Sequence, residues 1–195
     1  MKKIYKILLT ALVVFIAGLF LFTKQDFEDF KTQLARVSVD YDQSVKAEHG
    51  KPIRVVKAVD GDTVQLINGE YLRYIGIDTP EEFDPRKPVQ CFAKEAAEQN
   101  RQLVEGKDIM FYNDVSVKDR YGRWLGFVYL ADGTLVNKKL VSEGYAFSYE
   151  YKPDISKSEE FDLAQENAKN NNLGLWAHCR IYILNGGREQ TNDLQ

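Results

Sequence analysis

The sequence predicts a mainly β fold with added α-helices: a five-stranded β-barrel of the OB type plus three helices, preceded by an N-terminal hydrophobic helix. Runs of β-branched and aromatic residues alternate with turn residues between positions 53 and 131. A helical pattern interrupts these runs after the third strand, and further helical patterns follow the last one. About five short strands in that arrangement fit a small closed barrel.

Composition narrows the class of protein. The 195 residues suffice for one domain with a core and extensions. The hydrophobic content of 44% excludes wholesale disorder. The net charge is −3, and because residues 1–24 hold four lysines and no acids, residues 25–195 carry −7. That acidity excludes binding of nucleic acid through bulk positive charge. Any polyanion must therefore be met by local arginines and a metal ion.

Residues 1–24 are predicted to be a signal peptide or a membrane anchor. A lysine-rich leader precedes residues 7–22, which are all apolar or small. As a helix this stretch would reach roughly 24 Å, which is short of a comfortable span but longer than the hydrophobic region of a typical signal peptide. No clear small-residue cleavage site follows, so the anchor is slightly favoured. Both readings export the remaining chain, which would be secreted or anchored to the membrane outside the cytoplasm.

The rest of the chain divides into three parts. Residues 25–50 are polar and acidic and are expected to form a linker or stalk. Residues 51–180 are expected to form the barrel domain. Residues 181–195 are expected to be a polar tail, and the sequence suggests no role for them.

The expected strands are separated by clear turn residues. They span residues 53–59, 64–67, 71–77, 108–117 and 124–131. Asn68-Gly69 between the second and third strands is the strongest short-range hairpin signal. If these two residues alone form the loop, Asp62 faces Ile75. Asp132-Gly133 is expected to form a second turn after the last strand.

Three helices are expected from apolar spacing. The first covers residues 92–103 and ends at Gly106, and the second covers residues 136–144. Ser156 and Glu159 have the spacing of a capping box ahead of the third helix.

The first hairpin gathers four carboxylates at one place. Asp60 and Asp62 lie on one strand, and Asp78 and Glu81 lie just past the other, with Arg73 on the same hairpin. Such a cluster is unfavourable unless a cation neutralises it. The sequence therefore predicts a metal site here. For Asp60, capping of the local turn is favoured over metal ligation.

A second group of charged residues, Asp119-Arg120-Tyr121-Gly122-Arg123, lies between the last two expected strands. The planar guanidinium of arginine donates two parallel hydrogen bonds to a phosphate. A merely solvated basic turn is the alternative. Arg73 lies inside a strand, and a buried arginine needs a partner, which would be either a neighbouring acid or a bound phosphate.

Together these segments resemble the thermonuclease family, the micrococcal-nuclease-like phosphodiesterases. The matching pieces are Val59-Asp60-Gly61-Asp62-Thr63, Leu72-Arg73, Ile77-Asp78-Thr79-Pro80-Glu81, Asp119-Arg120-Tyr121-Gly122-Arg123, Tyr149-Glu150-Tyr151-Lys152-Pro153 and Leu173-Gly174-Leu175-Trp176. They occur in the family's order across roughly residues 52–179. One piece alone would be weak, whereas the whole ordered set is specific.

The resemblance implies a calcium site and a general base. Asp62, Asp78 and the backbone carbonyl of Thr79 correspond to the calcium ligands. Calcium fits this set because it prefers hard oxygen ligands, completed by waters and a substrate phosphate oxygen. Glu81 corresponds to the base that activates the attacking water.

The resemblance also implies how the substrate is bound. Arg73 and Arg123 correspond to the two arginines that bind the phosphodiester and stabilise its transition state. Arg120 and Tyr121, in the same motif as Arg123, are expected to contact the substrate.

Tyr149 and Tyr151 correspond to tyrosines that line the nucleotide pocket. Stacking of a base on an aromatic ring tolerates any sequence, which suits an enzyme acting on both DNA and RNA. Since the two positions alternate as in a strand, one of them could instead belong to the core.

The two cysteines, Cys91 and Cys179, lie far apart and form no CxxC motif for zinc or redox chemistry. Some exported relatives carry cysteines at similar places, so the resemblance implies a disulfide that joins the C-terminal region to the barrel. Two buried free thiols are the alternative, which an exported location disfavours.

These observations lead to one functional interpretation with two alternatives. The expectation is an exported, monomeric, calcium-dependent endonuclease that hydrolyses DNA and RNA through attack of water and leaves 3′-phosphate ends. The first alternative is a catalytically inactive binding module for nucleic acid or protein on the cell surface. The second is an envelope protein that binds calcium only structurally.

Overall fold

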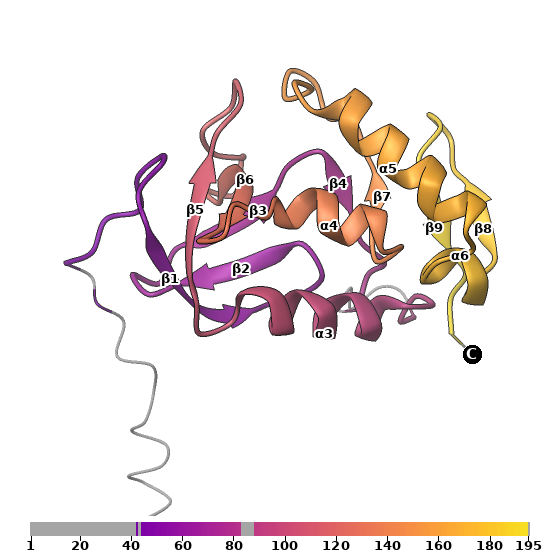
Figure 1. Ribbon diagram of the computed structural model, residues 1–195, viewed down its shortest axis with the longest axis horizontal. Coiled ribbons are helices and arrows are strands. Elements are labelled where there is room, and N and C mark those ends of the chain that lie inside the picture. The colour runs from indigo at the N-terminus through magenta and orange to yellow at the C-terminus, as the bar shows by residue number, and fades with distance from the viewer. Residues whose placement is uncertain (1–41, 43, 83–87, 195) are drawn as a thin grey trace, which may run out of the picture. The chain divides into compact units, whose positions relative to one another are not determined.

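Five strands close into a barrel in this computed structural model, which describes residues 42, 44–82 and 88–194. The strands are β1 (Ile53–Ala58), β2 (Thr63–Leu66), β3 (Tyr71–Tyr74), β5 (Asp108–Tyr112) and β6 (Trp124–Leu130). Their order around the barrel is β1-β2-β3-β6-β5, and β5 pairs back with β1 (Figure 1). The β3–β6 pair is parallel and the other pairs are antiparallel. The predicted five-stranded barrel is confirmed.

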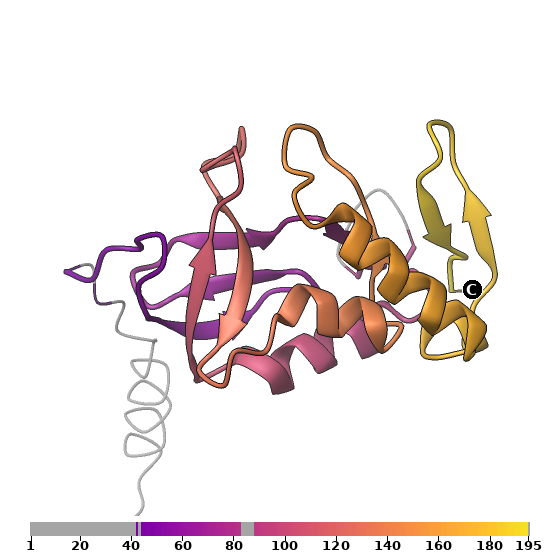
Figure 2. The same ribbon diagram turned by 45° about the horizontal axis from the view of Figure 1, so that its top comes forward.

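Helices and two small strand pairs complete the domain. The helices are α3 (Ala93–Val104), α4 (Val136–Ser142), α5 (Ser158–Asn170) and α6 (Leu175–His178). The small pairs are β4 (Ile77–Asp78) with β7 (Phe147–Ser148), and β8 (Ile181–Ile183) with β9 (Glu189–Thr191). Figure 2 shows the β8–β9 hairpin beside α5. No helix among the described residues is long and apolar enough to cross a membrane, and the expected N-terminal helix lies outside them.

The core lies inside the barrel and under the helices. Alternate residues of β1, such as Ile53 and Val55, point inward and are buried. Leu140 of α4 and Phe161 of α5 are fully buried against the same cluster. Burying each such side chain contributes about 1.5–3 kcal/mol to stability. The end of the expected linker also takes part, because Ala47 is buried in this core.

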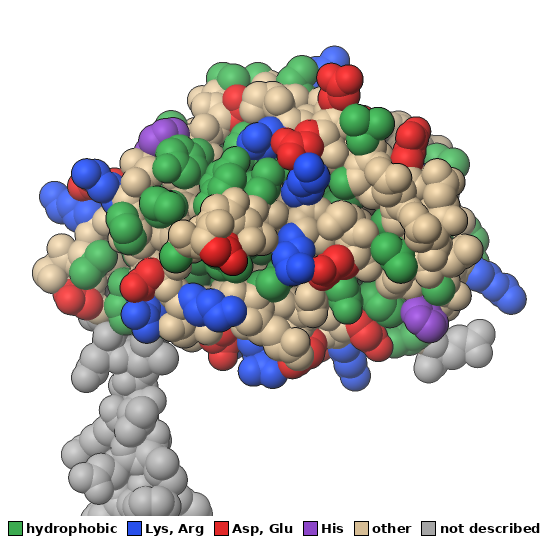
Figure 3. Space-filling model, viewed as in Figure 1, with side chains coloured by type: hydrophobic (Ala, Val, Ile, Leu, Met, Phe, Trp, Pro, Cys, Tyr) green, Lys and Arg blue, Asp and Glu red, His purple; other side chains and the backbone are tan. Residues whose placement is uncertain are grey.

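Charges of both signs are interspersed on the domain surface. Figure 3 shows basic and acidic side chains side by side on the viewed face. Lys118 Nζ lies 2.8 Å from Glu70, and Lys138 Nζ lies 2.9 Å from Glu160. Surface pairs of this kind add at most about 1 kcal/mol each. On this face, therefore, the domain has no broad basic patch of the kind that grips nucleic acid by charge alone.

The first hairpin has a register one residue away from the expected one. Thr63 pairs with Arg73, and the N–H of Tyr74 donates to the carbonyl of Asp62 at 2.8 Å. The expectation that Asp62 faces Ile75 is therefore wrong. The loop contains three residues rather than two, because Gly69 adopts a φ of 86° and closes a longer turn of the bulged type.

The expected strand over residues 71–77 is broken near its end. β3 stops at Tyr74, and Gly76 adopts a φ of 76° that side-chain-bearing residues avoid. A Cβ atom on Gly76 would also lie 2.6 Å from the ring of Phe161. The chain turns at this glycine, and β4 then pairs with β7 instead of extending the barrel. This turn directs Asp78 toward the open end of the first hairpin.

Several expected boundaries are corrected. The third helix begins at Ser158 without a side-chain cap, so the capping box was wrong. The N–H of Ser156 donates instead to Asp114 Oδ2 at 2.9 Å. The strand expected over residues 108–117 ends at Tyr112. Sequence reasoning also missed α6 and the β8–β9 hairpin, which occupies much of the expected polar tail.

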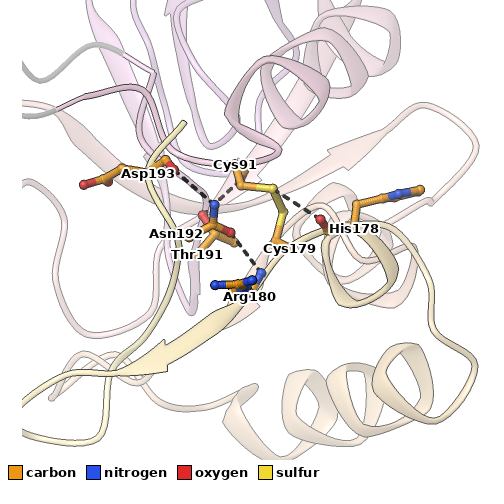
Figure 4. Close-up of a disulfide and its surroundings, with 7 residues drawn as sticks. All are labelled: Cys91, His178, Cys179, Arg180, Thr191, Asn192 and Asp193. Carbon is orange, nitrogen blue, oxygen red and sulfur yellow. Dashed lines mark hydrogen bonds between the residues drawn. A yellow bond between two sulfur atoms is a disulfide. The ribbon is translucent and has the colours of Figure 1, made fainter. Parts of the chain in front are cut away.

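A disulfide joins the C-terminal region to the segment before α3. The sulfur atoms of Cys91 and Cys179 are 2.05 Å apart, the pairing that the resemblance implies (Figure 4). The N–H of Cys91 donates to the carbonyl of Asn192 at 2.7 Å. The hydroxyl of Thr191 donates to the carbonyl of Cys91 at 2.9 Å. The hairpin is thus fixed to the domain by covalent and hydrogen bonds together.

Replacing both cysteines, Cys91→Ser with Cys179→Ser, is expected to lower the free energy of unfolding by about 4 kcal/mol. The bond spans 88 residues, so its loss releases a large conformational entropy in the unfolded chain. Urea unfolding of oxidised wild type, reduced wild type and the double variant measures the effect. The reduced wild type should match the variant. A loss below about 1 kcal/mol would contradict the expectation.

Candidate active site

Four predicted site residues come together at one end of the first hairpin. Asp62 lies in the turn before β2, Arg73 lies on β3, and Asp78 and Thr79 lie at and after the end of β4. Asp62 is fully buried, and Asp78 and Thr79 are also buried. Buried carboxylates require partners, and each has them here.

Asp62 has partners at both carboxylate oxygens. Its Oδ2 accepts hydrogen bonds from the N–H and the hydroxyl of Thr79, each at 3.0 Å. Its Oδ1 is ion-paired with Nη1 of Arg73 and accepts the hydroxyl of Thr63 at 3.2 Å. These bonds fix Asp62 against the chain that follows β4.

Asp78 is bound by two arginines. Its Oδ1 accepts a hydrogen bond from Nη2 of Arg73 at 3.1 Å. Its Oδ2 accepts from Nε and Nη2 of Arg188, at 2.9 and 2.7 Å. Because one guanidinium, that of Arg73, reaches both Asp62 and Asp78, the two carboxylates share one small site.

Glu81 is half-buried beside these acids. Burial raises the pKa of its carboxyl above the ordinary value, and the charges of Asp78 and Asp60 raise it further. The positive charges of Arg73 and Arg188 act in the opposite direction on the same pKa. Glu81 therefore lies within electrostatic range of both the acids and the arginines of the site.

Asp60 has the turn-capping geometry favoured from the sequence. Its Oδ1 accepts the N–H of Asp62 at 3.0 Å. Burial raises the pKa of Asp60, whereas the charges of Arg73 and Arg123 lower it. From behind, the side chain of Asn100 donates to the carbonyl of Asp60 at 2.8 Å, which anchors this turn to α3.

The loop between β5 and β6 forms its own polar cluster. Arg123 Nε donates to Asp119 Oδ2 at 2.7 Å, and Asp119 Oδ1 accepts the N–H groups of Tyr121 and Arg123. The guanidinium of Arg120 lies 4.8 Å from the centre of the Tyr121 ring. Among the described residues Arg123 thus pairs with Asp119, and the structure does not bring it into contact with Asp62 or Asp78.

The two tyrosines of the motif differ in position. The N–H of Tyr149 donates to the carbonyl of Gly76 at 3.0 Å, and its ring lies 5.5 Å from the guanidinium of Arg188. Tyr151 is 67% exposed. Tyr149 adjoins the acids through Arg188, whereas Tyr151 lies further out. Neither side chain is a buried core residue.

The oxygen groups of Asp62, Asp78 and Thr79 suit a hard cation. The set offers two carboxylates and a backbone carbonyl, with no sulfur or imidazole, which matches the preference of calcium. Across residues 42, 44–82 and 88–194, no group of three or more His, Cys, Asp or Glu side chains is arranged to hold a metal. A cation here would therefore need additional ligands from water or a substrate.

Arg188 is the site residue that sequence reasoning missed. It is 110 residues away from its partner Asp78 and belongs to the part expected to be a polar tail. The expected disulfide was the available signal, since a link from Cys91 to Cys179 brings the following residues close to the barrel. It did not indicate which of those residues would reach the acids.

A closed OB-type barrel with buried acids and arginines at one end is the arrangement that the resemblance to the nuclease family implies. A family model described as "Staphylococcal nuclease homologue" matches residues 71–178, more than half of the chain. The chain belongs to this family, as the resemblance indicated.

Curated relatives carry matching names. The chain is 36% identical to Endonuclease YncB of Bacillus subtilis (strain 168) over 136 residues, which cover 67% of this chain and 64% of that protein. It is 34% identical to Thermonuclease of Staphylococcus hyicus over 128 residues, 64% of this chain and 75% of that one. With the prophage-derived endonuclease YokF of B. subtilis the match covers 42% of the relative. The chain thus spans less than two thirds of YncB and YokF. The names of these relatives are those of nucleases.

The close approach of Gly61 to Thr79 gives a test of this geometry. A Cβ atom on Gly61 would lie 2.7 Å from the Cβ, Cγ2 and Oγ1 atoms of Thr79. We expect Gly61→Ala to lower the free energy of unfolding by about 2–3 kcal/mol, because Thr79 must move away from Asp62. Urea unfolding measures the loss. Adding Thr79→Gly, which removes all three of these atoms, should recover part of it, and a purely additive double variant would contradict the assigned contact.

Proposed function

We propose that this chain is an exported, calcium-dependent endonuclease that hydrolyses phosphodiester bonds in DNA and RNA and leaves 3′-phosphate ends. The observation that carries the proposal is the contact of one arginine, Arg73, with both Asp62 and Asp78 in a chain of the nuclease family. Glu81 lies within electrostatic range of the same group. This combination suits chemistry on a negatively charged phosphate.

Asp62, Asp78 and the Thr79 carbonyl would hold the calcium ion, which supplies positive charge beside a bound phosphate. Glu81 takes the proton from the attacking water. Its raised pKa makes the carboxylate a better proton acceptor than an exposed glutamate.

Arg73 and Arg123 bind the phosphodiester and stabilise the charge that develops on it. Arg123 is held by Asp119 in a partly exposed pair, with 32% of the Arg123 side chain accessible. Such a pair is weak in water, so a phosphate can replace Asp119 as the partner. The charge of Arg123 lowers the pKa of Asp60, which supports its proximity to the acids.

Exposed aromatic and basic groups would bind the rest of the nucleic acid. Tyr121 and Tyr151 are 69% and 67% exposed and can stack on bases without sequence preference. Tyr149 lies beside the acids, where a nucleotide next to the scissile bond would sit. Arg120, which stacks over Tyr121, adds a charge on the same loop.

The chain has a net negative charge, and on the face shown in Figure 3 the charges of both signs are interspersed. Attraction of the substrate is therefore proposed to come mainly from calcium and from the local arginines. The domain is proposed to act as a monomer. Its export through residues 1–24, as a cleaved signal or as a membrane anchor, is a proposal supported by the Cys91–Cys179 disulfide, because disulfides are typical of exported proteins.

Calcium removal is the first test. The purified protein is expected to degrade single-stranded DNA and RNA in millimolar calcium, and EDTA should abolish the degradation, because the acids then lose their cation. Gel analysis of labelled oligonucleotides measures it, and phosphatase treatment of the products reports 3′-phosphate ends. Calcium-dependent thermal stabilisation without any cleavage would instead indicate a structural calcium site or an inactive binding module.

Glu81→Gln and Arg123→Ala are each expected to lower kcat by about 10²–10³-fold, because each removes a group that acts on the reacting phosphate. Steady-state cleavage of a labelled oligonucleotide at saturating substrate measures the loss. Matched controls are Glu98→Gln and Arg101→Ala on the exposed face of α3, where these two residues pair only with each other and near neighbours. Both controls should retain wild-type kcat. Unchanged turnover in a site variant that remains folded would remove that residue from the mechanism.

A further inference from the structure

We propose that Arg188 is a substrate-binding residue of the same site, whose guanidinium binds a backbone phosphate of the nucleic acid. The inference rests on the proposed nuclease function and adds a third arginine, supplied by the C-terminal hairpin, to Arg73 and Arg123. Four observations carry it: the position of Arg188, its support, its neighbour Tyr149, and its exchangeable partner.

Arg188 lies at the rim of the acid cluster. Its Nε and Nη2 donate to Asp78 Oδ2 at 2.9 and 2.7 Å, while 39% of its side chain remains exposed. Asp78 is only 8% exposed at its side chain. Arg188 therefore contacts a buried acid and is also accessible from the solvent, from which a nucleic acid approaches. Its planar donor face matches two oxygens of a phosphate.

The backbone of Arg188 is held by the N–H of Leu184, which donates to the Arg188 carbonyl at 2.8 Å, and the side chains that follow it are also bound. Glu189 accepts hydrogen bonds from Lys169 at 2.8 Å and from Gln165 at 3.0 Å, both on α5. Thr191 is fully buried and bonded to Cys91, which carries the disulfide. An arginine on a fixed backbone loses less conformational entropy when it binds a ligand than one on a free tail. These contacts indicate that the fold holds Arg188 in a fixed position at the site.

Arg188 also lies beside an expected nucleotide contact. Its guanidinium is 5.5 Å from the centre of the Tyr149 ring. The ring of Tyr149 and the carboxylate of Asp78 both contact this guanidinium, and together they hold it at the edge of the site. A nucleotide that packs on Tyr149 therefore brings its phosphate within reach of Arg188.

Arg188 is now paired with Asp78, and a cation at the site would bind the same carboxylate. Asp78 gives one oxygen to Arg73 and the other to Arg188. A divalent cation and an arginine that donates twice compete for the same carboxylate charge. When Asp78 binds a cation, Arg188 loses much of its attraction to that oxygen, and a phosphate becomes its best partner.

Oligonucleotide binding without cleavage tests this role. In a Glu81→Gln background with calcium, fluorescence anisotropy of a labelled single strand is measured over a range of salt concentrations. Adding Arg188→Ala is expected to raise Kd about tenfold and to reduce the salt slope by about 0.7, the value for one lost phosphate contact. Arg188→Lys keeps the charge without the planar donor pair and should give an intermediate Kd.

Arg180→Ala in the same background is the matched control. Arg180 is an exposed arginine on the same terminal segment, and its backbone rather than its side chain binds Asn192. Its removal should leave Kd and the salt slope unchanged. If Arg188→Ala does not fold, Arg188→Gln keeps a side chain that can donate to Asp78 while it removes the charge, with the same binding effect expected.

Equal Kd and salt slope for the Arg188 and Arg180 variants, in a parent protein that binds the oligonucleotide, would overturn the inference and leave the nuclease proposal intact. Tighter binding by Arg188→Ala would also overturn it, since Arg188 would then be only a counter-charge that blocks Asp78. If the parent binds no oligonucleotide and the wild type cleaves none, both proposals fail together.

Discussion

The arrangement of the site depends on a single guanidinium between two buried acids. Arg73 pairs with Asp62 and with Asp78, and at an effective dielectric constant of 20 each close pair is worth about 4 kcal/mol before desolvation. Without Arg73 the two carboxylates would repel each other in a poorly hydrated place. Strand β3 fixes this arginine because it is paired on both sides, with β2 and with β6. The barrel therefore serves the site chiefly by holding one side chain in register.

The barrel was predictable because its signals are local. Alternating strand residues and glycine turns mark each strand within a few positions, and no long-range information is needed to count them. Two details did not follow from these signals. The register of the first hairpin depends on the left-handed conformation of Gly69, which the Asn-Gly pair allows but does not impose. The early end of β3 depends on Gly76 packing against Phe161, 85 residues further along the chain.

The residues of the candidate site likewise divide into those that a local motif predicts and those that it does not. The positions of Asp62, Arg73 and Asp78 could be predicted together because all three lie on the first hairpin or within a few residues of its ends. Arg188 could not, since its approach depends on a disulfide, a buried threonine and contacts with α5 that no short motif reveals. Arg123 pairs with Asp119, although its charge also reaches Asp60 and lowers the pKa of that carboxyl. A motif specifies which residue types are present, whereas the choice between two nearby carboxylate partners depends on final geometry.

The acids and arginines of this site satisfy one another, and this has a consequence for binding. Asp62 and Asp78 hold Arg73 and Arg188, so the groups that attract a cation and the groups that attract a phosphate are occupied together. Under the proposed function a cation at the acids frees the arginines, and a phosphate at the arginines frees the acids. Such coupling is reciprocal, so each ligand must increase the affinity of the other by the same factor. Residues 25–195 carry a net charge of −7, so this linkage favours binding of nucleic acid at the place where the cation binds.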